Sequence, residues 1–94
     1  MAQATFEFTS DVTVIDAVRE FVKEQADARG FEEEDVYSLQ LAVVEAVTNV
    51  IVHAYEGEVG HPIWLEAETD EAGLTFVLRD QGRQFDIVAH PDPD

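Results

Sequence analysis

Three polar residues inside an apolar run constrain the fold of this chain more than any other feature. The run LAVVEAVTNVIVHAY covers residues 41–55 and carries Glu45, Asn49 and His53 at intervals of four. Because four residues make just over one helical turn, the three side chains would lie along one stripe of a helix. A helix this apolar is expected to be buried, where an unpaired polar group costs roughly 1–3 kcal/mol. The stripe is therefore either a polar seam satisfied by neighbouring loops or a stripe that faces a ligand.

A net charge of −16 limits the partners of the chain. Twenty-one acidic residues stand against five basic ones, so most of the surface should repel phosphate backbones, and nucleic acid is not an expected partner. A bound nucleotide would need backbone N–H groups, a bridging cation or arginine, since Lys23 is the only lysine. The same excess of acids also fits a role in solubility or adaptation to a salty cytosol.

Length and apolar content indicate one small soluble domain that spans residues 1–94. Hydrophobic residues make up 46% of the chain, which is enough for a core. The sequence has no 18-residue apolar stretch, and its first residues, MAQATFEF, lack the basic and apolar regions of a signal peptide. Without cysteine there are neither disulfides nor thiolate metal sites. We therefore expect a cytoplasmic protein with no membrane partner.

Hydrophobic periodicity predicts the element order β-α-α-β-β. Strands are expected at residues 5–9, 62–69 and 74–80, with the hairpin turn at 70–73. A first helix follows a cap at Ser10 or Asp11 and ends before Gly30, and a second runs from about Asp35 to Tyr55. This order favours an α/β two-layer sandwich with both helices on one face of a mixed sheet.

The same periodicity predicts which residues form the core. The second helix should bury one stripe against the inward positions of the strands. The helix positions are Val36, Leu39, Val43, Val47 and Val50, and the strand positions are Phe6, Phe8, Ile63, Leu65, Ala67, Phe76 and Leu78. Trp64 and Val77 would lie on the opposite face of the sheet, so we expect a homodimer that uses this face or a free strand edge.

The strand at 74–80 ends in a motif that suits a binding site. Asp80 supplies a carboxylate, and Gly82 follows in a flexible turn where backbone can approach a ligand closely. The motif is weak by itself, since both residue types are common in turns. Together with Glu45 and Asn49 on a covering helix, however, Asp80 could line one pocket.

Three segments carry a family resemblance. EAVTN (45–49), IVHAY (51–55) and DQGRQFD (80–86) together resemble the GHKL ATPase superfamily of gyrases, histidine kinases and mismatch-repair proteins. The HAY ending and the short β-α-α prelude are most similar to the anti-sigma-factor serine kinases of the RsbW/SpoIIAB type. The resemblance implies an incomplete Bergerat (GHKL) ATPase fold, ATP and Mg as cofactors, and two partners, a sigma factor and an anti-sigma-factor antagonist.

The resemblance also assigns roles to single residues. Glu45 matches the general base that polarises the attacking hydroxyl or water. Asn49 matches the residue that binds magnesium through its side-chain oxygen. Asp80 matches the carboxylate that accepts a hydrogen bond from the adenine amino group, and Gly82 matches the glycine of that adenine-binding turn.

Two further matches carry less chemistry. His53 belongs to the family pattern and is expected to make a structural hydrogen bond at the helix end. Arg19 corresponds to a surface that the family uses for partner proteins.

The sequence departs from the family after DQGRQFD. There the family continues with a mobile lid and a glycine-rich segment whose backbone donors and helix N-terminus hold the phosphates. The five glycines of this chain include no such cluster. We expect an ATPase domain without its lid, last helix and last strand, which is inactive alone as a 94-residue chain. It is either a fragment of a kinase or a short relative that does not turn over ATP.

Two alternative functions remain. The first is a non-catalytic protein-interaction module that keeps the fold with a degenerate nucleotide site. The second is a fragment of a sensor histidine kinase, which the HAY sequence and the lack of preceding dimerisation helices disfavour.

Overall fold

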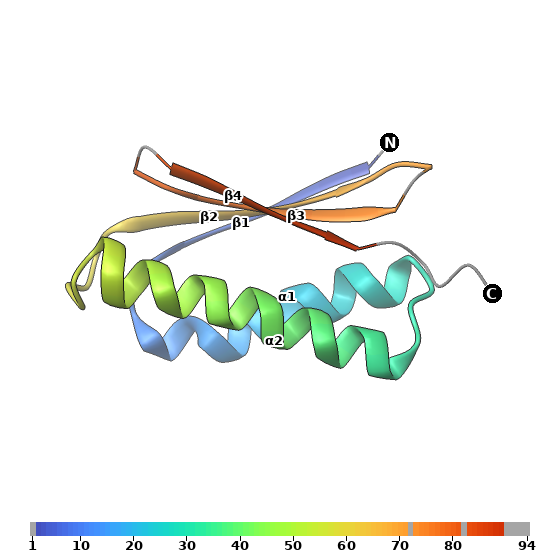
Figure 1. The fold of residues 1–94 in the computed structure, drawn as a ribbon, viewed down its shortest axis with the longest axis horizontal. Helices are drawn as coiled ribbons and strands as arrows, with labels where there is room; N and C mark the ends of the chain where they lie inside the picture. The colour runs from blue at the N-terminus through green and yellow to red at the C-terminus, as the bar shows by residue number, and fades with distance from the viewer. Residues whose placement is uncertain (1, 72, 82, 90–94) are drawn as a thin grey trace.

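Two helices cover one face of a four-stranded sheet (Figure 1). The computed structural model describes residues 2–71, 73–81 and 83–89. The elements in chain order are β1 (Ala2–Thr9), a 3-10 turn η1 (Val12–Val14), α1 (Ile15–Ala28), α2 (Glu33–Asn49), a π-helical turn η2 (Val50–Ala54), β2 (Pro62–Thr69), β3 (Leu74–Asp80) and β4 (Arg83–Ala89).

The two-layer α/β sandwich is confirmed, but the expected mixed sheet is wrong for the described strands. The strands are ordered β1-β2-β3-β4, and every neighbouring pair is antiparallel. The reason lies in the connection between β1 and β2. The chain reverses direction on entering α1, again at α2 and again at β2, so β2 returns antiparallel to β1 (Figure 1).

The sheet also has one strand more than the sequence pattern predicted. The predicted strands at 62–69 and 74–80 coincide with β2 and β3. β4 then pairs with β3 from Asp80↔Arg83 to Leu74↔Ala89. In the sequence RQFDIVA, apolar and polar residues alternate only over 84–87, because Val88 and Ala89 follow Ile87.

The core lies between the helices and the inner face of the sheet, as predicted. All five positions expected on the second helix are buried, and on the strands only Phe6 is partly exposed. The first helix contributes Val18, Val22 and Ala26, each with 0% of its surface exposed. Because these three residues recur every four positions, α1 presents one continuous apolar stripe.

Local chemistry explains where the 3-10 turn η1, which leads into α1, begins and where α1 ends. The Asp11 carboxylate accepts hydrogen bonds from the backbone N–H of Thr13, at 3.0 Å, and from its hydroxyl, at 2.9 Å. These bonds favour the ionised form and lower the pKa of Asp11 below its usual value. After the helix, Gly30 takes a φ of 86°, a left-handed conformation that glycine adopts without a steric penalty.

The outer face of the sheet exposes less apolar surface than expected. Trp64 is half-buried there, but Val77 is only 4% exposed. Val77 lies in an inner strand, opposite Glu66 of β2 and Asp86 of β4, so neighbouring strands flank it on both sides. Of the two residues on which the expected dimer face rested, Trp64 is therefore the one that remains accessible.

The second helix and its π-helical turn, Glu33–Ala54, are long and apolar enough by length and composition to cross a membrane. The core helix of a folded domain passes the same test. Here Val36, Leu39, Val43 and Val47 belong to the hydrophobic core. Of its most apolar 18-residue window, 33% is buried inside the fold, while Leu41 and Val52 are 44% and 48% exposed.

Candidate functional site

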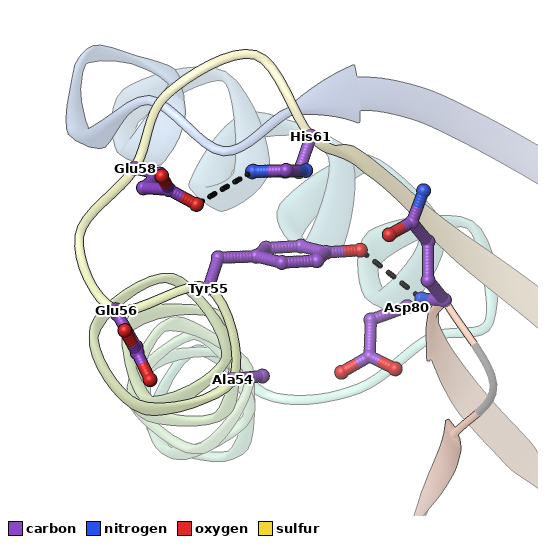
Figure 2. A pocket seen from close by; sticks show the side chains of 7 residues that line it. Ala54, Tyr55, Glu56, Glu58, His61 and Asp80 are labelled. Carbon is purple, nitrogen blue, oxygen red and sulfur yellow. Dashed lines mark hydrogen bonds and ion pairs between the residues drawn. The ribbon is translucent and has the colours of Figure 1, made fainter.

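A cavity of about 280 Å³ opens where the end of the second helix meets the end of β3 (Figure 2). Three segments line it: the last residue of η2, the loop that follows, and the turn after β3. The lining residues are Ala54, Tyr55, Glu56, Glu58, His61, Asp80 and Gln81. The cavity therefore joins two of the segments that carried the family resemblance.

Tyr55 connects the walls of this cavity. Its side chain is buried, with 7% exposed. The hydroxyl group donates a hydrogen bond to the carbonyl of Pro62, at 2.8 Å, and accepts one from the backbone N–H of Gln81, at 3.0 Å. One side chain thus ties the end of the second helix to the start of β2 and to the turn after β3.

A wide helical turn places Tyr55 at this position. The Tyr55 N–H bonds to the carbonyl of Val50, five residues earlier, at 3.0 Å. Two left-handed residues then end the helix, Glu56 with a φ of 54° and Gly57 with 79°, and the Gly57 N–H bonds to the carbonyl of Ile51 at 2.8 Å. This bond spans six residues, one more than the bond between C″ and C3 in a Schellman motif. Single π-helical turns of this kind occur frequently at functional sites.

His61 covers one side of the Tyr55 ring. The two ring centroids are 4.5 Å apart and the ring planes are inclined by 15°. His61 Nε2 also lies 3.2 Å from Glu58 Oε1, an ion pair when the imidazole is protonated. Figure 2 shows His61 on one side of the Tyr55 ring and Asp80 with Ala54 on the other. The Tyr55 ring therefore lies between His61 and the Asp80 carboxylate.

Ser10 holds the loop between the second helix and β2 in place. Its side chain is fully buried, and its hydroxyl donates to the Glu58 carbonyl at 2.7 Å and accepts from the His61 N–H at 2.9 Å. The Ser10 N–H donates to the His61 carbonyl at 2.7 Å. The proposed cap at Ser10 or Asp11 is thus resolved: Asp11 caps the turn before α1, while Ser10 holds the loop.

Asp80, predicted as a site residue, lies in the wall of the cavity. It is the last residue of β3 and only 5% exposed. Gly82, the glycine predicted beside it, lies outside the described residues. The neighbouring backbone at Gln81 is held by Tyr55. The structure thus places Asp80, one of the predicted carboxylates, in the same cavity as Tyr55.

Glu45, Asn49 and His53 lie elsewhere, and the idea of a buried polar seam is wrong. All three residues are exposed. The valines of α2 take the side that faces the core, and the stripe lies on another side of the helix. Along the helix axis, Asn49 lies about 7 Å before the cavity residue Ala54, and Glu45 lies about 13 Å before it. Neither belongs to the cavity lining, and both are exposed to solvent.

The other predicted residue, Arg19, lies on the exposed surface of α1, with Nη1 3.4 Å from Asp16 Oδ1. Among the described residues no group of three His, Cys, Asp or Glu side chains could hold a metal ion.

Tyr55, His61 and Ser10 were not predicted as residues of the site. Tyr55 stood at the end of an apolar helix, where a buried hydroxyl needs a hydrogen-bond partner; that requirement was the available signal. His61 and Ser10 lie in segments read only as a loop and a cap. Their contact is made across 51 sequence positions, and no local pattern reports it.

The fold and the matched segments define a class of protein. The chain belongs to the family of the histidine kinase-like ATPase domain, whose model matches residues 8–94.

Within this class the chain is similar to named regulators. It is 33% identical over 75 residues to the serine-protein kinase RsbW of Halalkalibacterium halodurans, covering 80% of this chain and 45% of that protein. It is 37% identical over 62 residues to RsbW of Listeria innocua, covering 66% and 40%. It is 35% identical over 49 residues to the anti-sigma F factor of Shouchella clausii, covering 52% and 34%. The predicted resemblance to the RsbW type is confirmed. The chain spans less than half the length of each of these relatives.

Proposed function

We propose that this chain forms the adenine- and magnesium-binding part of an anti-sigma-factor serine kinase. The kinase would bind ATP–Mg, sequester a sigma factor and phosphorylate an anti-sigma-factor antagonist. The observation that carries the proposal is the position of Asp80: within the segment matched by the family, a carboxyl group that is only 5% exposed lies in the wall of a cavity beside the end of the second helix.

The cavity suits a purine base. Pockets for small molecules span roughly 300–1,000 Å³, so about 280 Å³ fits a base rather than a whole nucleotide. An ionised aspartate only accepts hydrogen bonds, and the amino group of adenine is a donor. Asp80 would therefore select a base that carries an amino group, with the backbone after β3 close to its edge.

Asn49 and Glu45 would act on the exposed side of the helix. A side-chain amide oxygen is a hard ligand that suits Mg²⁺, which keeps several waters and takes few protein ligands in nucleotide sites. Glu45, one turn earlier and exposed, would accept the proton of a serine hydroxyl presented by a partner protein.

Further properties belong to the same proposal. We expect the kinase to act in the cytoplasm and as a homodimer. Without a glycine-rich cluster, and with a net charge of −16, the 94-residue chain has few donors for a triphosphate. The chain alone should thus bind the base better than the phosphates.

A second candidate function is a non-catalytic interaction module. The observation in its favour is that Glu45 and Asn49 lie outside the lining of the cavity. Such a module would keep the fold and its partner surface, and neither residue would affect the binding of a ligand.

The experiment follows NMR signals of the chain during titration with adenosine. Adenosine carries no phosphate and thus reports on the base site alone. We expect shifts around Ala54, Asp80 and Gln81, and weaker binding by Asp80→Asn than by wild type. Asp70→Asn, in the turn after β2, is the matched control. Equal affinities for wild type and Asp80→Asn would contradict the adenine role of Asp80.

A further inference from the structure

We infer that Tyr55 is a positioning residue for the base site, one that holds the backbone after Asp80 in its binding conformation. The inference rests on the proposed function, because Tyr55 would act on the site proposed to bind the base. It would touch neither a nucleotide phosphate nor a metal. It starts from the hydroxyl group of Tyr55, which lies between two segments distant in the sequence (Figure 2).

The two hydrogen bonds of this hydroxyl have different directions and different functions. The bond donated to the Pro62 carbonyl, at 2.8 Å, orients the hydroxyl proton toward β2. The oxygen lone pairs then face the Gln81 N–H, which donates at 3.0 Å. Because donor and acceptor are both satisfied, the hydroxyl has one preferred orientation, and the residue next to Asp80 has a fixed anchor.

The anchor is itself held in place by a rigid support. His61 stacks on the ring of Tyr55 with centroids 4.5 Å apart. Ser10, fully buried, bonds to the backbone on both sides of the loop, at the Glu58 carbonyl and at the His61 N–H and carbonyl. The turn after β3 is thereby connected through Tyr55 and His61 to the end of β1. This connection pre-organises the turn before any ligand arrives.

Pre-organisation has a measurable consequence. If the turn is released, only a fraction of the molecules present Asp80 and Gln81 correctly, and the apparent affinity for the base falls by that fraction. Loss of a hydrogen bond to a part-buried N–H group corresponds to a change of roughly tenfold. The ring of Tyr55 would remain stacked on His61 in Tyr55→Phe, so the change isolates the hydroxyl.

The test compares wild type, Tyr55→Phe and Tyr37→Phe in the whole chain. Tyr37 is 62% exposed on α2 and is the matched control for loss of a hydroxyl. Amide hydrogen exchange at Gln81 reports on the anchor, and titration with adenosine reports on the base site. We expect Tyr55→Phe to exchange the Gln81 amide about tenfold faster and to bind adenosine about tenfold more weakly, while Tyr37→Phe matches wild type.

The outcomes separate the positioning role from the proposed function. Unchanged exchange at Gln81 in Tyr55→Phe would overturn the anchor. Faster exchange with unchanged adenosine affinity would overturn the positioning role, provided that Asp80→Asn does weaken binding. If Tyr55→Phe binds adenosine more weakly and Asp80→Asn binds it as well as wild type, the result would support the positioning role of Tyr55 and contradict the adenine role of Asp80. If neither variant changes binding, or wild type gives no adenosine shifts, both proposals fail.

A measurement on wild type keeps the anchor testable even if Tyr55→Phe does not fold. In NMR spectra, the hydroxyl proton of Tyr55 should exchange slowly enough to be observed. It should also show a nuclear Overhauser effect to the Gln81 amide proton. A hydroxyl proton in rapid exchange with water would overturn the anchor.

Discussion

Phe21 of α1 meets Phe76 of β3 edge to face, with ring centroids 6.5 Å apart and ring planes at 68°. Phe21 also stacks on Phe6 at 5.7 Å, and Phe6 lies 5.0 Å from Phe8. These rings form a row that joins the first helix to β1 and β3. Aromatic pairs in such geometries contribute about 0.5–1.5 kcal/mol beyond the area they bury. The row is therefore a principal contact between the two layers.

Truncation of Phe76 should destabilise the fold strongly. Phe76 is fully buried, and Phe76→Ala removes its contacts and leaves a cavity, which costs about 3–5 kcal/mol of unfolding free energy. Urea unfolding followed by circular dichroism measures the change. Tyr37→Ala on the exposed face of α2 is the control. A midpoint equal to that of wild type would show that Phe76 does not face the helices.

Replacement of Glu56 by glycine should stabilise the fold. Glu56 holds a φ of 54° at the end of the second helix, where a side chain incurs a steric cost that glycine avoids. We expect Glu56→Gly to raise the free energy of unfolding by about 1 kcal/mol. Glu56→Ala removes the same charge but retains Cβ, so it should bring no such gain. Equal melting temperatures of the two variants would refute the strain.

Nucleotide affinity should depend on a phosphate-binding segment. Calorimetry should detect little binding of ATP–Mg to the 94-residue chain, because its surface is strongly acidic. Extension by the family's glycine-rich segment should restore binding. In that extended protein, Glu45→Gln should lower phosphoryl transfer about 10²–10⁴-fold without loss of ATP affinity, since a general base acts in the transition state. Micromolar binding by the 94-residue chain would overturn the first expectation.

The control for this prediction is Glu33→Gln, an exposed acid in the first turn of the same helix. It removes the same charge at a distance from the base site and should leave both rate and affinity unchanged. Full kinase activity in the extended Glu45→Gln protein would exclude Glu45 as the base.

The protein should associate as a homodimer through the outer face or an edge of its sheet. Trp64 is a large apolar residue of that face and is partly accessible, so Trp64→Glu should shift the equilibrium toward monomer. Val77→Ala changes a side chain that is 4% exposed and should affect stability rather than association. Sedimentation velocity at high micromolar concentration measures both. A wild-type protein that remains monomeric throughout would rule out the dimer.

Asp11 should titrate below the usual range of aspartate. Its hydrogen bonds to Thr13 lower its pKa in the folded state. Its contribution to stability is therefore complete above the pKa of the unfolded chain and is lost as pH falls through the lower, folded value. Carboxyl carbon shifts in an NMR titration report this pKa directly. Thr13→Ala should raise the Asp11 pKa only modestly, because it removes the hydrogen bond from the hydroxyl and retains the one from the backbone N–H. An ordinary value in wild type would contradict the cap.

Most of the fold was predictable because its apolar pattern is regular. The stripe from Val36 to Val50 predicted the buried side of the second helix, and alternation predicted the inner face of β2 and β3. The antiparallel sheet was not predicted, since strand direction depends on how α1 and α2 return the chain. Alternation within one strand shows which of its faces is buried, but not which strand lies beside it.

The site was less predictable because it is assembled from distant segments. Asp80 could be found from its motif, and the structure places it in a cavity. The exposure of Glu45 and Asn49 depends on which side of the helix the valines occupy. The contacts of Tyr55 with Pro62 and Gln81 depend on the angle between helix and sheet. A family resemblance identifies residues, but it does not show which of them share a cavity.

The long connection between β1 and β2 bears on how the chain reaches this fold. Ser10 and His61 meet across 51 positions, whereas β2 and β3 are joined by a tight turn in which Asp70 and Gly73 exchange hydrogen bonds. Closing a long loop costs more entropy than closing a short one. The β2–β3 hairpin and the helix pair can therefore form early, and the addition of β1 should come late and limit the folding rate. A newly made chain would then expose the edge of β2 until its own first strand returns to cover it.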